Sequence, residues 1–193
     1  MWNSESAEMT DNPNRLPYEG EKLTQHLVNL VNAHPTPEKL TEIKRKFEQI
    51  YTQLPEIATH ILMEYSELLH KWDLDPGRVD LYMVGGRVKG KPLKEDSDID
   101  LIIGVENPSQ SAEVLLFDRF PGDPIAAMDF RLMLKQQILA KVNEACVQGV
   151  VPVPNEFHIL NYGTTVPKAN INSPSSLLIA TYPPQTNDGN TLK

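Results

Sequence analysis

A change in hydrophobic period at Val79 divides this 193-residue chain into two parts. Before it, apolar residues recur every three or four positions, which is the spacing of a helix with one buried face. Thr36-Pro37 is a helix-start signal, and it is followed by the stripe Leu40, Ile43, Phe47 and Ile50. A second helix is expected after Pro55, with the stripe Ile57, Ile61, Tyr65, Leu68 and Trp72. An earlier stripe predicts a further helix around Leu23, Leu27, Leu30 and Val31.

From Val79 onward, the pattern indicates strands separated by a helix. Val79–Val84 alternates like a half-buried strand, Ile99–Val105 is a second apolar run, and Phe157–Asn161 is a third. Asp123-Pro124 opens a helix that extends to about Gln148, with its buried face expected at Phe130, Leu132, Leu134, Ile138, Leu139, Val142 and Ala145. The fold class expected is α+β, with a small mixed β-sheet packed with helices and preceded by a helical N-terminal half.

The two ends of the chain differ in composition from the middle. Residues 1–20 are expected to be a flexible N-terminal arm and residues 172–193 a flexible C-terminal tail, although Leu177–Ala180 could dock as a short strand. Residues 21–171 are expected to form a single domain, helical over 21–75 and with a sheet-bearing core over 78–165.

Charge and cysteine content exclude several classes of protein. The 18 Lys and Arg against 26 Asp and Glu give a net charge of −8, which argues against broad, nonspecific binding of nucleic acid. The single cysteine, Cys146, excludes an internal disulfide and a cysteine-based zinc site. No apolar run approaches the ~20 residues that span a bilayer, and the N-terminus does not have the profile of a signal peptide. A cytoplasmic location is expected.

The chemistry is concentrated between the first two strands. Gly85 and Gly86 follow the first strand, and their missing side chains let backbone N–H groups approach an anion closely. Asp98 and Asp100 lie at the start of the second strand, where positions i and i+2 face the same way. Two such carboxylates repel each other unless a cation lies between them, and Mg²⁺ prefers oxygen ligands. This combination favours phosphoryl or nucleotidyl transfer.

A Gly-Gly pair after a strand, a loop of this length and Asp98-Ile99-Asp100 in an apolar strand resemble the polymerase-beta-like nucleotidyltransferase superfamily. Gly85–Gly90 and Asp96–Leu101 are most similar to its minimal nucleotidyltransferase branch. The resemblance implies a nucleotidyltransferase-type sheet in which Gly85, Gly86 and Ser97 bind the nucleotide. It also implies that Asp98 and Asp100 bind two Mg²⁺ ions, with Mn²⁺ as an alternative.

The third carboxylate of that superfamily is absent from its expected place. Phe157-His158-Ile159 puts a histidine at the centre of the third strand. Glu156 shares strand parity with His158 and is the first candidate for the missing catalytic carboxylate, and His158 could itself accept a proton. Asp129 ranks last because it falls on a predicted helix.

Four cations, Arg87, Lys89, Lys91 and Lys94, lie in the loop before the aspartates. Because of their position between the two halves of the motif, Arg87 and Lys89 are predicted to bind nucleotide, whereas Lys91 and Lys94 are expected to face solvent. Asp96 is expected to hydrogen-bond the local backbone where the chain enters the second strand.

The function expected is Mg²⁺-dependent transfer of a nucleoside monophosphate from a triphosphate such as ATP. The acceptor is a hydroxyl or phosphate on a protein, an RNA or a small molecule. The alternative is a nucleotide-binding or protein-interaction module that keeps this fold with weakened catalysis. The resemblance also allows a helical partner protein, as in toxin–antitoxin pairs.

Overall fold

The computed structural model describes residues 21–32, 37–146, 157–162 and 176–184. Its helices and strands follow the order α1 (Glu21–Asn32), η1 (Glu38–Leu40), α2 (Thr41–His70), β1 (Val79–Val84), α3 (Gly85–Val88), β2 (Ile99–Val105), η2 (Pro108–Gln110), α4 (Ala112–Arg119), α5 (Pro124–Cys146), β3 (Phe157–Tyr162) and β4 (Ser176–Tyr182). No helix in these described ranges is both long enough and apolar enough to cross a membrane.

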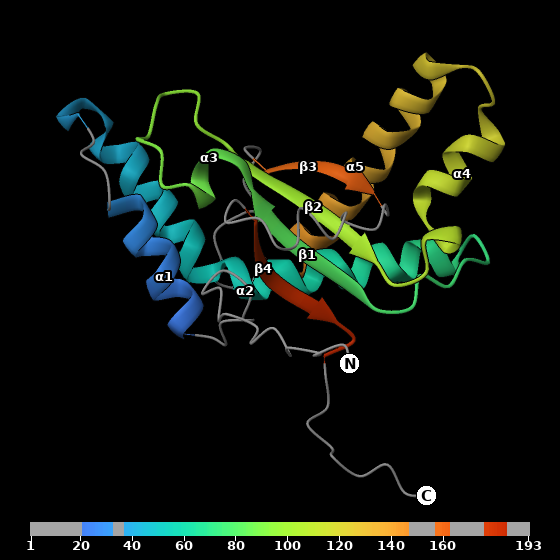
Figure 1. Ribbon diagram of the computed structural model, residues 1–193, viewed down its shortest axis with the longest axis horizontal. Helices are drawn as coiled ribbons and strands as arrows, with labels where there is room; N and C mark the ends of the chain where they lie inside the picture. The colour runs from blue at the N-terminus through green and yellow to red at the C-terminus, as the bar shows by residue number, and fades with distance from the viewer. Residues whose placement is uncertain (1–20, 33–36, 147–156, 163–175, 185–193) are drawn as a thin grey trace, which may run out of the picture.

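The four strands form one mixed sheet in the order β3-β2-β1-β4 (Figure 1). β1 is antiparallel to β2 and to β4, and β2 is parallel to β3. The three strands expected from the sequence are therefore present, and β1 and β2 are neighbours. This mixed sheet with helices before it confirms the predicted α+β class.

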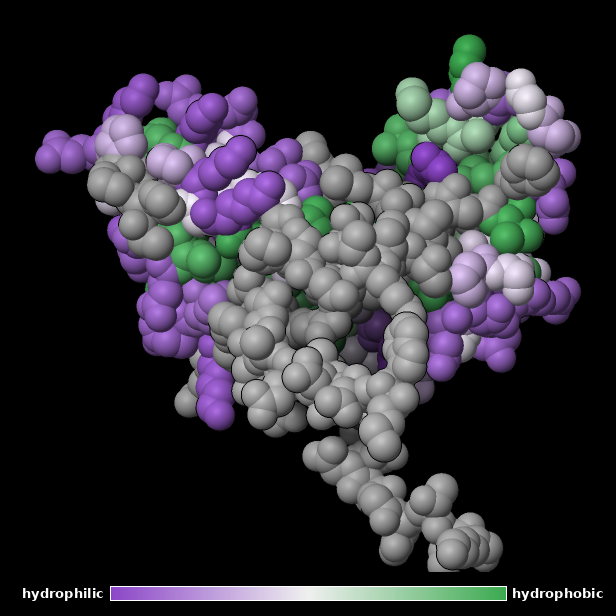
Figure 2. All heavy atoms as spheres, viewed as in Figure 1, coloured by the Kyte–Doolittle hydropathy of each residue, from purple (hydrophilic) through white to green (hydrophobic). Residues whose placement is uncertain are grey.

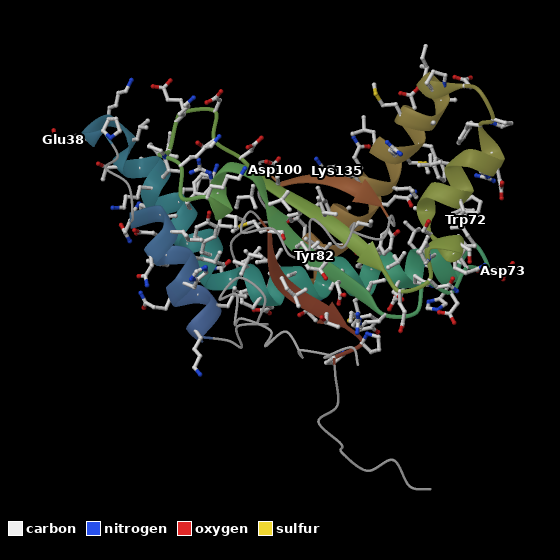
Figure 3. All side chains as sticks on the ribbon, in the orientation of Figure 1. Glu38, Trp72, Asp73, Tyr82, Asp100 and Lys135 are labelled. Carbon is white, nitrogen blue, oxygen red and sulfur yellow. The ribbon has the colours of Figure 1, made fainter. Side chains whose placement is uncertain are left out.

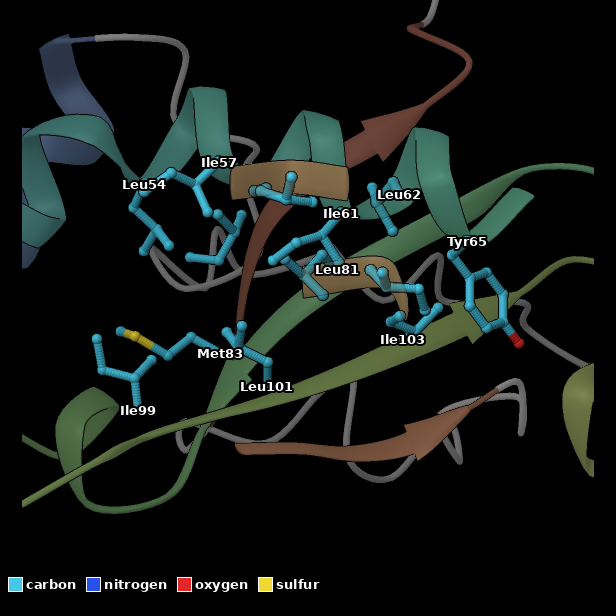
Figure 4. Close-up of a cluster of buried hydrophobic side chains, with 14 of the residues drawn as sticks. Leu54, Ile57, Ile61, Leu62, Tyr65, Leu81, Met83, Ile99, Leu101 and Ile103 are labelled. Carbon is cyan, nitrogen blue, oxygen red and sulfur yellow. The ribbon is translucent and has the colours of Figure 1, made fainter. Parts of the chain in front are cut away.

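Helix α2 runs across one face of the sheet and packs on β1 and β4 (Figure 1). Its buried residues continue along one stripe, which meets the alternate residues of β1 and β2 in the core shown in Figure 4. The labelled core residues are Leu54, Ile57, Ile61, Leu62 and Tyr65 from α2 and Leu81, Met83, Ile99, Leu101 and Ile103 from the strands.

The expected break before a second helix at Pro55 is wrong, because α2 is continuous over 30 residues with Pro55 inside it. Proline removes one backbone donor and favours a kink. Tyr51 and Leu54 before it and Ile57 and Ala58 after it are all buried against the same core. Their packing holds both halves in one helix, since tertiary contacts supply most helical stability in proteins.

The predicted helix from Asp123-Pro124 is confirmed as α5. Its first turn is capped by the Asp123 carboxylate, whose Oδ1 accepts hydrogen bonds from the backbone N–H groups of Ile125 (3.1 Å) and Ala126 (3.0 Å). Its buried face includes Leu134, Ile138 and Val142 as predicted. Two residues assigned to that face, Leu132 and Ala145, are exposed instead.

The exposed side of α5 carries a patch of apolar side chains at the projecting end of the α4–α5 hairpin. The patch consists of Ile125, Met128, Leu132 and Met133 (Figure 2). Beneath it, Phe130 packs edge-on against Trp72 at 6.1 Å between ring centroids, and the Arg119 guanidinium lies 4.0 Å from the centroid of Trp72. Trp72 therefore belongs to the junction between α2 and the hairpin, as its place in a helical stripe suggested.

Strand β4 lies within the segment whose composition predicted a flexible tail. Residues 176–182 pair with the whole of β1, and Leu177 and Ile179 are buried in the core. β1 pairs with β2 along one edge and with β4 along the other, so β4 satisfies the backbone hydrogen bonds of the edge that β2 leaves open. The expected N-terminal arm, residues 1–20, lies outside the described residues.

Candidate active site

The two halves of the glycine–aspartate motif meet where β1 ends and β2 begins. Val84, the last residue of β1, is paired with Asp100. Gly85 follows with φ +77°, and its α-carbon lies against the Asp100 carboxylate, so that a β-carbon there would collide with Asp100 Oδ2. Figure 3 shows Asp100 at this end of the sheet, beside α3. Only glycine satisfies both the positive φ and the close approach.

After Gly85, the chain folds back over a single helical turn. Val84 is extended, with φ −133° and ψ −176°, and α3 begins at the next residue. The N–H of Lys91 donates to the carbonyl oxygen of Gly86 at 3.0 Å, and the N–H of Gly90 donates to that of Arg87 at 3.1 Å. These bonds close residues 85–91 into a compact loop beside Asp100.

The cations of this loop point in different directions. Lys89 is exposed. Lys91 is also exposed, and its aliphatic chain covers Gly86, with Cδ 3.5 Å from the place a β-carbon would occupy. Lys91 faces solvent as expected, and its aliphatic chain also lies against the second glycine. The bond from the N–H of Lys91 back to Gly86 is a local feature of the loop that its composition does not reveal.

Arg87 is buried rather than facing solvent. One of its guanidinium nitrogens donates to the carbonyl oxygen of Pro92 at 3.4 Å, and its Cζ lies 5.7 Å from the centroid of the Phe47 ring on α2. Its charge also lowers the pKa of Tyr51, although burial of that phenol dominates and leaves the pKa well above its usual range. Nucleotide contact by Arg87 stays a prediction, and the contacts described here place its side chain between the loop and α2.

Ser97 and Asp98 lead the chain into β2. The Ser97 hydroxyl oxygen accepts the backbone N–H of Lys94 at 2.8 Å, and the N–H of Ser97 donates to the Lys94 carbonyl at 3.2 Å. This turn presents Asp98 directly before the strand, half-buried like Asp100. Asp96 is exposed in the same turn. The predicted nucleotide contact of Ser97 is not tested by these bonds, but its hydroxyl helps to hold the strand entry.

The position of the third carboxylate stays open. In the parallel pairing of β2 with β3, residue 158 is the partner of Asp100, so the backbone of β3 passes beside the motif. Glu156, the first candidate, lies outside the described residues. Asp129 lies exposed on α5, and the structure does not bring it to Asp100 through any pairing or contact in the described ranges.

The donor atoms present suit a magnesium ion that is shared with a substrate. Among the described residues, no group of three His, Cys, Asp or Glu side chains could hold a metal on its own. Mg²⁺ is commonly bound by one or two carboxylates together with phosphate oxygens and water. Asp98 and Asp100 beside a side-chain-free turn fit that kind of site.

A polar network on β1 was not anticipated from the sequence. The Thr181 hydroxyl donates to Asp80 Oδ1 at 2.7 Å, and Arg78 forms an ion pair with Asp80 at 3.4 Å. Burial, reinforced by Asp80, raises the pKa of Tyr82 to about 12. Because side chains alternate along a strand, Asp80 and Tyr82 lie on the same face of the sheet as Asp100. The alternation of residues along β1 was the sequence signal that could have identified them.

A cleft of about 780 Å³ opens at the other end of β1. Two carboxylates there bond the local backbone, because Asp75 Oδ1 accepts the N–H of Gly77 at 3.0 Å and Glu106 Oε2 accepts the N–H of Arg78 at 3.0 Å. These bonds order the turn before β1, which gives the two carboxylates a structural role. The volume of this cleft is therefore not a reason to prefer it to the site at Asp98 and Asp100.

Comparison with known families covers the part of the chain that carries this motif. A sequence model of the nucleotidyltransferase domain matches residues 66–161, which run from the last turn of α2 to β3 and include both glycines and both aspartates of the motif. Comparisons with curated proteins and with solved structures found no significant match.

Proposed function

We propose that this chain, whose residues 66–161 match a sequence model of the nucleotidyltransferase domain, is an Mg²⁺-dependent enzyme of the minimal branch of the nucleotidyltransferase superfamily. It transfers a nucleoside monophosphate from a triphosphate such as ATP to a hydroxyl or phosphate acceptor. The observation that carries this proposal is the contact between the Asp100 carboxylate and the α-carbon of Gly85. It brings the metal-binding and phosphate-binding halves of the motif within one substrate's reach.

Each part of the site has a role in that reaction. Asp98 and Asp100 would hold Mg²⁺, which when bound offsets the negative charge of the phosphates and of the leaving pyrophosphate. Gly85 and Gly86 leave the backbone open to the triphosphate. Lys89 and Lys91 are exposed cations beside that turn and attract the same anion.

The transfer forms one bond to phosphorus and breaks one. An acceptor oxygen bonds to the α-phosphorus of the triphosphate, the bond from that phosphorus to the bridging oxygen breaks, and pyrophosphate leaves. The acceptor's proton passes to a base, for which Glu156 and His158 are the candidates. The acceptor itself can be a protein side chain, an RNA end or a small molecule. The resemblance also allows a helical protein as a partner of the enzyme.

A second candidate is a nucleotide-binding module with weakened catalysis. The observation that favours it is the pairing of Asp100 with His158, at the strand position where the superfamily carries a carboxylate. Such a module would bind triphosphate without releasing pyrophosphate.

Incubation with Mg²⁺ and each labelled triphosphate separates these candidates. We expect label transfer or pyrophosphate release from the wild type and none from the double variant Asp98→Asn plus Asp100→Asn, because the amides cannot bind the metal as anions. Asp96→Asn is the matched control, since it removes an exposed carboxylate two residues away. Activity that survives the double variant would overturn the enzymatic proposal, and a ligand-induced rise in Tm without turnover would support the binding module.

A further inference from the structure

Arg87, the residue after the Gly85–Gly86 pair, carries a positive charge that lies between the 85–92 loop and α2. The side chain is buried, with the residue 9% exposed, although it lies only one position after the second glycine. An arginine guanidinium stays protonated in proteins, so this charge cannot be relieved by losing a proton.

Among the residues that the structure describes, the partners of this guanidinium are neutral. They are the Pro92 carbonyl at 3.4 Å and the Phe47 ring at 5.7 Å. The neighbouring phenol of Tyr51 is buried, and its hydroxyl has no hydrogen-bond partner in the described structure. Across the described ranges, Arg87 forms no ion pair with a carboxylate.

A buried charge without a counter-ion is costly to keep in a folded protein. The cation–π contact and the single carbonyl bond offset only part of this cost. An anion bound at the turn above would lower the cost further, since electrostatic attraction is screened weakly across a low-dielectric layer.

We propose that Arg87 is a positioning residue that anchors the 85–92 loop to α2 and whose buried charge favours binding of the triphosphate over the monophosphate. The proposal rests on the proposed function. Arg87 acts from below the loop, through the backbone of α3, and does not contact the phosphates. Its hydrogen bond to the Pro92 carbonyl connects the start of the loop to its end. Its cation–π contact with Phe47 holds the loop against α2.

Three variants separate the charge from the anchor. Arg87→Met removes the charge and keeps most of the aliphatic packing, whereas Arg87→Lys keeps the charge and loses the planar fork. Phe47→Leu keeps the arginine and removes the ring beneath it. Arg78→Met is the matched control, because it removes an exposed arginine at the opposite end of β1.

The measurement is the Kd of the Mg²⁺ complex of the best-bound nucleoside triphosphate, compared with the Kd of its monophosphate. For Arg87→Met we expect the triphosphate Kd to rise about 10- to 100-fold, because the attraction of a buried charge for the phosphates across a low-dielectric layer is lost. The monophosphate Kd should change less than about threefold, because that ligand carries less charge. Arg87→Lys should recover most of the triphosphate affinity, and Arg78→Met should bind as the wild type does.

Turnover gives a second readout. Arg87→Met should raise KM for the triphosphate far more than it lowers kcat, a split that a general loss of packing would not produce. Phe47→Leu should lower Tm while changing the triphosphate Kd less than about fivefold.

The outcomes distinguish this inference from the function on which it rests. A folded Arg87→Met protein with wild-type triphosphate affinity overturns the inference and leaves the proposed function standing. Equal loss of triphosphate and monophosphate affinity also overturns it, since that would indicate packing alone. A wild type that binds no triphosphate overturns both. Should Arg87→Met not fold, wild-type-like triphosphate preference in Arg87→Lys supports the inference, and loss of that preference contradicts it.

Discussion

At the scale of single residues, Gly85 holds the site together. Its φ of +77° lies in the left-handed region, and its α-carbon is in contact with the Asp100 carboxylate. Any side chain would strain the backbone and displace the carboxylate at once. Gly86 differs, because a β-carbon there would meet only the flexible chain of Lys91 at ordinary contact distance, 3.5 Å. The physical requirement for glycine is therefore strict at position 85 and weak at position 86.

Replacing Gly85 with alanine tests this difference. We expect Gly85→Ala to lower the free energy of unfolding by about 1–3 kcal/mol, from backbone strain, and to lower transfer activity at least about tenfold because Asp100 moves. Urea unfolding and pyrophosphate release measure the two effects. Gly86→Ala is the control and should be nearly neutral in stability. Equal behaviour of the two variants would contradict the packing described at Asp100.

At the scale of elements, α2 shows how a buried stripe can override a local signal. Pro55 lies in the middle of a 30-residue helix whose buried residues continue on both sides of it. The Thr59 hydroxyl donates to the Pro55 carbonyl at 2.9 Å, so that carbonyl keeps a side-chain partner inside the helix. The helix therefore stays continuous through Pro55, because the free energy gained by packing it on the sheet exceeds the cost of the proline.

Removing that residue should stabilise the protein. Pro55→Ala restores one backbone donor, and we expect the free energy of unfolding to rise by about 1–3 kcal/mol, with a higher Tm. Pro108→Ala is the matched control, since Pro108 stands at the start of η2, where no donor is needed. A lower Tm for Pro55→Ala would show that the proline is required for the shape of α2.

At the scale of the whole molecule, the sheet is completed by a segment distant in sequence. Thr181 of β4 donates to Asp80 of β1 across 101 positions, and Leu177 is fully buried beside β1. Gly85 directly follows β1, so the strand that positions the candidate active site is supported by β4 on one edge and β2 on the other.

Chains ended at two positions test that support. A chain ended at residue 171 lacks β4, and we expect it to lose cooperative thermal unfolding, because β1 would expose an apolar edge. A chain ended at residue 184 keeps β4 and should melt like the full chain. Leu177→Ala in the full chain should cost about 2–5 kcal/mol in urea unfolding. A stable 171-residue chain would show that β4 is dispensable.

Several features followed from local sequence because their causes are local. The bounds of β1 were indicated by alternation, those of β2 by a short apolar run, and the start of α5 by the Asp123-Pro124 signal. The glycine–aspartate motif was recognisable because its chemistry depends on a short spacing. Leu132 and Ala145 were misplaced because α5 carries apolar residues on more than one side, so its sequence did not indicate which side would be buried.

The sequence by itself determined the α+β class and the elements around the motif, and it indicated the residues expected to bring chemistry to that motif. Only the tertiary structure decided that α2 passes through Pro55, that residues 176–182 become a strand, and that Arg87 turns inward while Lys91 covers Gly86. Periodicity, caps and turns act over a few neighbouring residues. Pairing across about a hundred positions, and the choice of which cation is buried, depend on which surfaces remain to be covered once the core has formed.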